Sequence, residues 1–176
     1  NSPQFIKQTF KDDFDSENLN LEWNFRRVPQ KGTYLMNNKD GYLRLFSSKN
    51  VIENRKGCSL LGIRQKKTDF KFSVKMLYNP IMQGGQAGIS LFQKDNNYFT
   101  FTVEKNKENH VLKLLLKERK KEPVVIHQTF IKSYNGSITF KVNSENNSYN
   151  FYYSLDDGNS YKSFLETGSD KILSNG

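Results

Sequence analysis

Alternation of apolar and polar residues runs along most of this chain and constrains its fold more than any other feature. The clearest case spans residues 70–78, where every second position is Phe, Val, Met or Tyr and the positions between carry Lys71, Ser73, Lys75 and Leu77. A period of two is typical of a half-buried antiparallel strand. Helical periodicity is almost absent, so we expect an all-β fold.

Similar segments follow one another along the chain, separated by clusters of Asn, Asp and Gly. The predicted strands are 9–14, 42–46, 59–65, 70–78, 86–93, 98–104, 111–117, 124–130, 137–143, 149–154 and 160–165. We expect the clusters at 95–97, 135–136, 146–147 and 156–159 to be hairpin connections, because Asn and Asp hydrogen-bond their own backbone and tolerate positive φ.

Short strands at regular spacing without helices favour a two-sheet antiparallel β-sandwich over a barrel. We expect a single domain over residues 1–176, a length that suits one core. The predicted inward residues are Phe70, Phe72, Val74, Met76, Ile89, Leu91, Phe99, Phe101, Val103, Leu112, Leu114, Leu116, Ile138, Phe140 and Val142.

Composition narrows the classes of site that the chain can carry. Only 35% of residues are hydrophobic, but 14% are aromatic, so the core must use large rings. The single cysteine, Cys58, excludes an internal disulfide and a thiolate-rich zinc site. Cysteine usage leaves the compartment open, and we favour a periplasmic or extracellular location over a cytoplasmic one.

The formal net charge of +9 raises the possibility of nucleic-acid binding. The only dense basic run, residues 113–121, is interrupted by Glu118, and we interpret it as a solvated hairpin tip. We expect neither a nucleic-acid partner nor a membrane, because no run of about 18 apolar residues occurs. The first ten residues lack the pattern of an intact signal peptide, and Asn1 suggests a processed or cloned piece.

No catalytic constellation is visible, and we predict no catalytic residue in this chain. His110 and His127 are the only histidines, and we expect both to be exposed strand residues. No G-x-S-x-G elbow occurs, and the Gly-rich stretch 84–88 lacks the Lys-Ser/Thr pair of a phosphate loop. The pair of facing carboxylates that glycosidase chemistry needs cannot be identified from sequence spacing.

An acidic cluster near the start of the chain has two interpretations. It consists of Asp12, Asp13, Asp15 and Glu17. Hard carboxylate oxygens could bind a structural calcium ion, but the pattern fails as an EF-hand loop, with Asn18 where glycine is required. Turn formation explains the cluster more simply. We therefore expect no cofactor or metal site, with structural calcium left open.

An aromatic-rich sandwich is suited to sugar binding, because sugar ring faces stack on Trp and Tyr while hydroxyls pair with planar polar groups. The carbohydrate-facing candidates are Trp23, Arg26, Arg44, Arg64 and Gln93. The alternative for Trp23, the only tryptophan, is burial in the core. For Arg44 and Arg64 the alternative is a structural role, in which the aliphatic part of the side chain is partly covered and the guanidinium is solvated.

Several segments, taken in order, resemble the C-terminal β-sandwich domain of family 43 glycoside hydrolases, the β-xylosidase and α-L-arabinofuranosidase type. They are 12–14, 23–29, 41–45, 61–65, 86–93 with 97–98, and 151–158. The resemblance implies a concanavalin A-like sandwich appended to a five-bladed propeller that carries the catalytic carboxylates and is not in this chain. Where the family commonly has two arginines before glutamine, this chain has Ile63-Arg64-Gln65, so a role for the first arginine does not carry over.

The resemblance implies a non-catalytic domain that packs on the propeller and helps shape its sugar pocket, with xylo-oligosaccharide or arabinoxylan as substrate of the parent glycoside hydrolase. The alternative is an independent lectin-like module that binds xylan or another plant polysaccharide. Residues 171–176 run into a turn signal, and related proteins continue into a Gly-Phe-Thr-Gly-like loop. We therefore expect the chain to be truncated near its C-terminal strand.

Overall fold

The structure is a computed structural model that describes residues 9–29, 31–39, 41–53, 57–146 and 148–167. The chain divides into two compact units, Asn1–Gln65 and Lys66–Gly176. All regular structure in the described ranges is β-strand, which confirms the all-β prediction. Within those ranges no helix of a length and hydropathy suited to a bilayer occurs.

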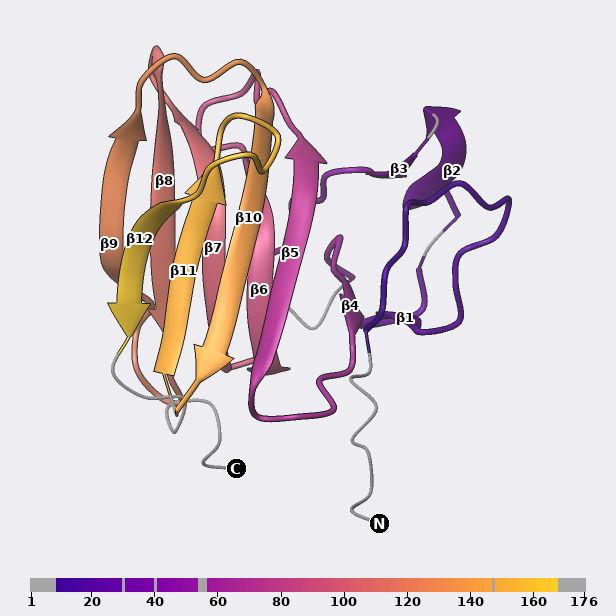
Figure 1. Cartoon of the computed structure of the whole chain (residues 1–176), viewed down its shortest axis with the longest axis horizontal. Coiled ribbons are helices and arrows are strands. Elements are labelled where there is room, and N and C mark those ends of the chain that lie inside the picture. The colour runs from indigo at the N-terminus through magenta and orange to yellow at the C-terminus, as the bar shows by residue number, and fades with distance from the viewer. Residues whose placement is uncertain (1–8, 30, 40, 54–56, 147, 168–176) are drawn as a thin grey trace. The chain divides into compact units, whose positions relative to one another are not determined.

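The second unit contains two four-stranded antiparallel sheets (Figure 1). One has the order β6-β7-β8-β9 and consists of β6 (Gln86–Lys94), β7 (Asn97–Asn106), β8 (Asn109–Lys117) and β9 (Val124–Ile131). The other has the order β12-β11-β10-β5 and consists of β5 (Phe70–Leu77), β10 (Ser137–Glu145), β11 (Ser148–Ser154) and β12 (Lys162–Thr167). The two sheets lie face to face, so the predicted sandwich is confirmed.

The core of the second unit lies between these sheets and is built largely from aromatic rings. The ring of Phe101 lies 4.9 Å from that of Phe140 and 4.7 Å from that of Phe164, between centroids. Both partners belong to the opposite sheet, so Phe101 ties the layers together. All the predicted inward residues belong to this core or pack against it, because strands of seven or more residues fix which side chains share a face.

Register within the sheets explains this agreement. Phe101 of β7 lies opposite Ile89 of β6 and Leu114 of β8, so three apolar residues face the core from neighbouring strands. Phe140 of β10 lies opposite Val74 of β5 in the same way. A shift by one residue would turn each strand's apolar face to solvent.

One predicted hairpin is wrong. The turn at 135–136 connects β9, which pairs with β8, to β10, which pairs with β5 and β11. The chain therefore crosses from one sheet to the other at this point. The cause is that Asn-Gly chemistry specifies a turn but not the strand with which the next segment pairs. The predicted connections at 95–97 and 156–159 join paired strands, as expected, although Asn97 already belongs to β7. The predicted connection at 146–147 includes Asn147, which lies outside the described residues.

The first unit contains two small antiparallel sheets. One pairs β1 (Trp23–Phe25) with β4 (Leu61–Ile63), and the other pairs β2 (Tyr34–Lys39) with β3 (Tyr42–Leu45). The predicted strand 59–65 is thus shorter than expected, and β1 and β2 were not predicted. β1, with three residues, is too short for alternation to show, and in β2 three apolar residues are followed by three polar ones, so apolar and polar positions do not alternate.

The predicted first strand, 9–14, is wrong: these residues form no strand. The backbone N–H of Phe14 donates to the side chain of Asp12 at 2.8 Å, and Phe14 has a φ of 52°. Both features end an extended run, because the aspartate side chain takes the backbone donor that a sheet would use. The expectation of an unfinished end concerns residues 171–176, which lie outside the described residues.

Candidate functional site

Trp23, the first of the predicted sugar-facing residues, is half-buried in an aromatic cluster of the first unit. Its indole N–H donates to Asp12 Oδ2 at 2.7 Å, while the other oxygen of that carboxylate accepts the N–H of Phe14. The ring of Phe14 stacks on the indole at 5.6 Å, and Phe10 approaches edge-on at 5.5 Å. Asp12 therefore fixes both the turn and the indole, which agrees with the turn reading of the acidic cluster.

Arg26 follows β1 and lies at the end of the β1-β4 sheet. Its backbone N–H donates to the carbonyl of Leu60 at 3.3 Å, and its Nη1 lies 3.4 Å from the sulfur of Cys58. The side chain is half-buried. These contacts hold the guanidinium against the segment that precedes β4.

Arg44 and Arg64 are both exposed. Arg44 lies on β3 opposite Leu35 of β2. Arg64 directly follows β4, one position after Ile63, which pairs with Trp23. Trp23, Arg26 and Arg64 thus lie on or beside one small sheet of the first unit, and Arg44 lies on the other.

Gln93 belongs to the second unit, whereas the other four predicted residues belong to the first. It lies near the end of β6, and its side-chain oxygen accepts a hydrogen bond from Asn97 Nδ2 at 2.6 Å. Asn97 is buried at the start of β7. The contact joins the two sides of the β6–β7 hairpin, which gives Gln93 a structural role.

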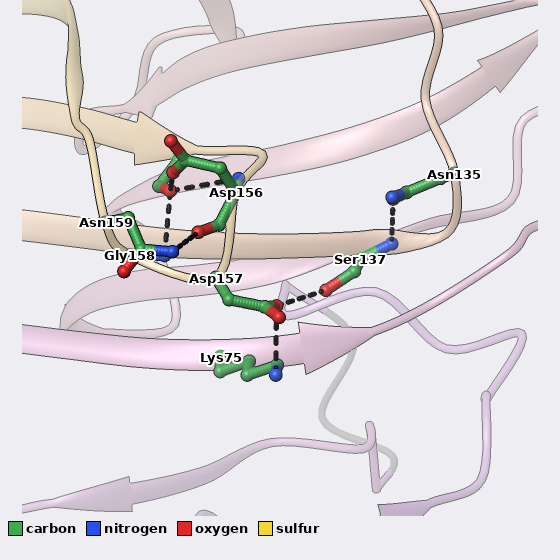
Figure 2. A network of polar contacts seen from close by, with 8 residues as sticks. Lys75, Asn135, Ser137, Asp156, Asp157, Gly158 and Asn159 are labelled. Atoms are coloured by element: carbon green, nitrogen blue, oxygen red, sulfur yellow. Dashed lines mark hydrogen bonds and ion pairs between the residues drawn. The ribbon is translucent and has the colours of Figure 1, made fainter.

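A dense polar network of the second unit lies in the β11–β12 hairpin (Figure 2). The carboxylate of Asp156 accepts hydrogen bonds from the hydroxyl of Ser154 at 2.6 Å, from the N–H of Ser160 at 2.9 Å and from its hydroxyl at 2.5 Å. These donors lower the pKa of Asp156 to about 2, with the Ser154 bond as the largest cause. The ionised carboxylate therefore holds the turn closed.

The neighbouring Asp157 ties this hairpin to the adjacent strands. Its carboxylate lies 2.9 Å from Lys75 Nζ of β5 and accepts a hydrogen bond from the hydroxyl of Ser137 of β10 at 3.3 Å (Figure 2). The hydrogen bond and charge of Lys75 lower the pKa of Asp157. The sequence predicted a hairpin connection at 156–159 and a family resemblance over 151–158, but not this network, although Ser and Asp around a turn are a known signal.

The histidines differ from each other. His127 is exposed, as expected. His110 is half-buried, its ring lies 4.7 Å from that of Tyr134, and burial followed by the charge of Lys105 lowers its pKa. The expectation of an exposed His110 is therefore wrong, because the tyrosine that covers it is distant in sequence.

Three aspartates are engaged in turns and ion pairs. Asp12 holds an indole, Asp156 holds a hairpin and Asp157 pairs with a lysine. Within the described ranges, no three His, Cys, Asp or Glu side chains gather as a metal site would require. What this geometry offers is positioned aromatic and cationic side chains, which suit binding and docking.

Comparison with known proteins identifies the family. The family model for the "Beta xylosidase C-terminal Concanavalin A-like domain" matches residues 11–175. The chain is 26% identical over 121 residues to the non-reducing end α-L-arabinofuranosidase BoGH43B of Bacteroides ovatus, covering 69% of this chain and 22% of that protein. It is 32% identical over 108 residues to a xylosidase/arabinosidase of Butyrivibrio fibrisolvens, covering 60% of this chain and 21% of that protein.

Among solved structures, the GH43 protein BlXynB of Bacillus licheniformis shares the fold, with a TM-score of 0.84 at 24% identity. The match covers 96% of this chain and 32% of that one. The chain thus spans about a fifth of the curated relatives and about a third of the solved protein. With residues 11–175 matched, the chain belongs to the concanavalin A-like C-terminal domain family of family 43 β-xylosidases.

Proposed function

We propose that this chain is the non-catalytic companion domain of a family 43 glycoside hydrolase of the β-xylosidase or arabinofuranosidase type. It packs on a catalytic propeller and helps shape that domain's sugar pocket. One observation carries the proposal: 96% of this chain matches only 32% of a GH43 protein, and 69% of it matches only 22% of an arabinofuranosidase. The proposed substrates of the parent enzyme are xylo-oligosaccharide or arabinoxylan, and the proposed location is periplasmic or extracellular.

The side chains support a role in positioning. The aspartates Asp12, Asp156 and Asp157 already hold an indole N–H, hydroxyl and backbone donors, and a lysine. A general acid must give its proton to the leaving group, and the pKa of Asp156, about 2, is far too low for that task at neutral pH. Arg44 and Arg64 are both exposed and can therefore face a sugar or a partner.

The test is the activity of the isolated chain on nitrophenyl β-xyloside and nitrophenyl α-L-arabinofuranoside. We expect no turnover above the uncatalysed rate at any pH between 4 and 9, where catalytic carboxylates work. Turnover that disappears when one carboxylate of this chain is changed to its amide would contradict the proposal.

A second candidate function, sugar binding by the sandwich itself, is favoured by one observation. The Nζ of Lys141 lies 4.9 Å from the ring centroid of Tyr152 and 4.1 Å from that of Tyr161. Lys141 and Tyr152 are neighbours on β10 and β11, and aromatic rings beside a donor suit a sugar. Calorimetric titration of the isolated chain with xylo-oligosaccharides tests it. Millimolar or tighter binding that is lost in Tyr152→Ala would favour sugar binding by the sandwich itself.

A further inference from the structure

The connection between β5 and β6 presents two large apolar side chains to solvent. Ile81 is 91% exposed and Met82 is 78% exposed, whereas Pro80 beside them is buried. In Figure 1 this connection lies at the end of the sandwich where β5 ends and β6 begins. Isolated exposed apolar residues are common, but two adjacent ones at this level of exposure contribute nothing to the core.

The loop that carries them is held firmly. The N–H of Gly84 donates to the carbonyl of Lys105 at 2.9 Å, and the N–H of Lys105 donates to Gly85 at 3.0 Å. The side-chain oxygen of Gln83 accepts the N–H of Lys107 at 2.6 Å. Gly84 has a φ of 75°, a conformation that glycine adopts without strain. The N–H of Gly85 also donates to the carbonyl of Met82 at 3.0 Å. Residues 82–85 therefore each take part in a hydrogen bond that holds the loop.

The other side of the loop is anchored by Tyr78. Its N–H donates to the carbonyl of Gly136 at 2.9 Å, and its carbonyl accepts the hydroxyl of Tyr134 at 2.6 Å. Burial raises the pKa of Tyr134 to about 12, so this hydroxyl remains a donor at any physiological pH. Both ends of the loop are therefore tied to the sandwich, and Ile81 and Met82 are displayed from a rigid base.

A rigid display of apolar side chains is what a binding anchor requires. The loop backbone is already ordered, so little backbone entropy remains to be lost on docking, and the remaining entropic cost is the rotamer freedom of the two exposed side chains. Anchors of this kind, each filling a pocket on the partner, dominate the energetics of interfaces. A pair of protruding side chains needs a complementary hollow. That need favours a different surface over a second copy, since a two-fold dimer requires a patch that fits itself.

We propose that Ile81 and Met82 are the anchor by which this domain docks into an apolar hollow on the catalytic domain of the same polypeptide. The inference rests on the proposed companion function. The length of a related protein indicates which partner the anchor binds. The matching part of the B. licheniformis GH43 protein is 32% of its chain, and the remaining part is covalently attached and therefore always near. Attachment gives the partner a high effective concentration, so a small anchor is sufficient.

The experiment uses the polypeptide that joins this chain to its catalytic domain, with a protease site placed in the connection before Asn1. After cleavage, the association of the two pieces is measured by calorimetry for the unchanged protein, for the double variant Ile81→Ser with Met82→Ser, and for the matched control Phe130→Ser. Phe130 is 64% exposed on β9, which lies at the opposite edge of its sheet from β6. Thermal melting of each released 176-residue piece checks that the variants are folded.

We expect the double variant to raise the dissociation constant at least about tenfold, which corresponds to about 1.4 kcal/mol, while Phe130→Ser leaves it within about twofold. An equal dissociation constant for the double variant and the unchanged protein would overturn the anchor and leave the companion function standing. No association between the unchanged pieces would instead overturn the companion function. Concentration-dependent dimers of the isolated chain that the double variant abolishes would assign the anchor to a second copy and also overturn the inference.

Discussion

The two units of this chain are stabilised by different kinds of contact. Among the residues that the structure describes, every fully buried side chain lies in the second unit, where Phe99, Phe101, Phe140 and Phe151 are almost completely enclosed. The described side chains of the first unit are half-buried or exposed. The second unit is therefore held by a shared core, and the first by separate contacts such as the Asp12–Trp23 hydrogen bond.

Strand length follows the same division. Strands of the second unit run from six to ten residues in four-stranded sheets, whereas those of the first run from three to six in two-stranded pairs. Two-stranded pairs are marginal by themselves in water. One domain of this family therefore combines a sandwich with a shared core and a part held by a few specific side chains.

The largest expected effect is the loss of a core ring. Phe101→Ala removes contacts with Phe140, Phe151 and Phe164 across the sandwich, and we expect the free energy of unfolding to fall by about 3–5 kcal/mol. Phe25→Ala, at a half-buried position beside Tyr34, should cost only about 1 kcal/mol. Urea unfolding followed by circular dichroism measures both. Equal losses would remove the proposed distinction between the units.

A smaller difference is expected between two glycines. A Cβ at Gly88 of β6 would lie 2.0 Å from the backbone oxygen of Phe101, so Gly88→Ala must push two strands apart. We expect it to cost about 1–3 kcal/mol. Gly62→Ala of β4, where a Cβ would have no neighbour within 4 Å, should be neutral or slightly stabilising. Melting temperatures of the two variants give the comparison, and a severe loss in Gly62→Ala would show that the first unit is packed as tightly as the second.

The third prediction isolates the first unit. Trp23 is the only tryptophan, so its fluorescence reports on that unit. Asp12→Ala leaves the indole N–H and the Phe14 N–H without their acceptor, and we expect a local cost of about 1–2 kcal/mol. The fluorescence transition in urea should move to lower concentration while the circular dichroism transition of the sandwich stays in place. Transitions that move together would mean that the two units unfold as one.

The smallest expected effect concerns the decline of the melting temperature at acidic pH. The pKa of Asp156 is lowered to about 2 from an ordinary value of 3.8, so its contribution to stability is fully present above pH 4 and is lost as the pH falls from 3.8 towards 2. Asp156→Asn should therefore flatten the decline of the melting temperature over that range. Asp69→Asn, which removes an exposed aspartate just before β5, is the control. A slope as steep in Asp156→Asn as in the unchanged chain would contradict the assignment.

The sandwich could be predicted from sequence because its information is local. In β5, burial alternates at every position from Phe70 to Leu77, so the pattern of side chains alone indicates which face is buried. The family resemblance was equally accessible, because several short segments occur in a specific order. Neither signal requires knowledge of which segments pair in the fold.

The candidate site could not be predicted to the same depth, because its contacts join residues that are distant in sequence. Trp23 is held by Asp12, and Arg26 lies against Cys58. Residues 9–14 were misassigned because the side chain of Asp12 takes a backbone donor that a strand would use. Residue type indicated which side chains could bind, but their partners required the fold.

The most direct test of the companion role compares the complete polypeptide with the same polypeptide lacking these 176 residues. The measurement is kcat/KM for nitrophenyl β-xyloside. We predict a loss of about tenfold or more on removal, since a pocket wall that positions the substrate is gone, and recovery when the separate chain is added back. An unchanged kcat/KM in the shortened enzyme would contradict the account.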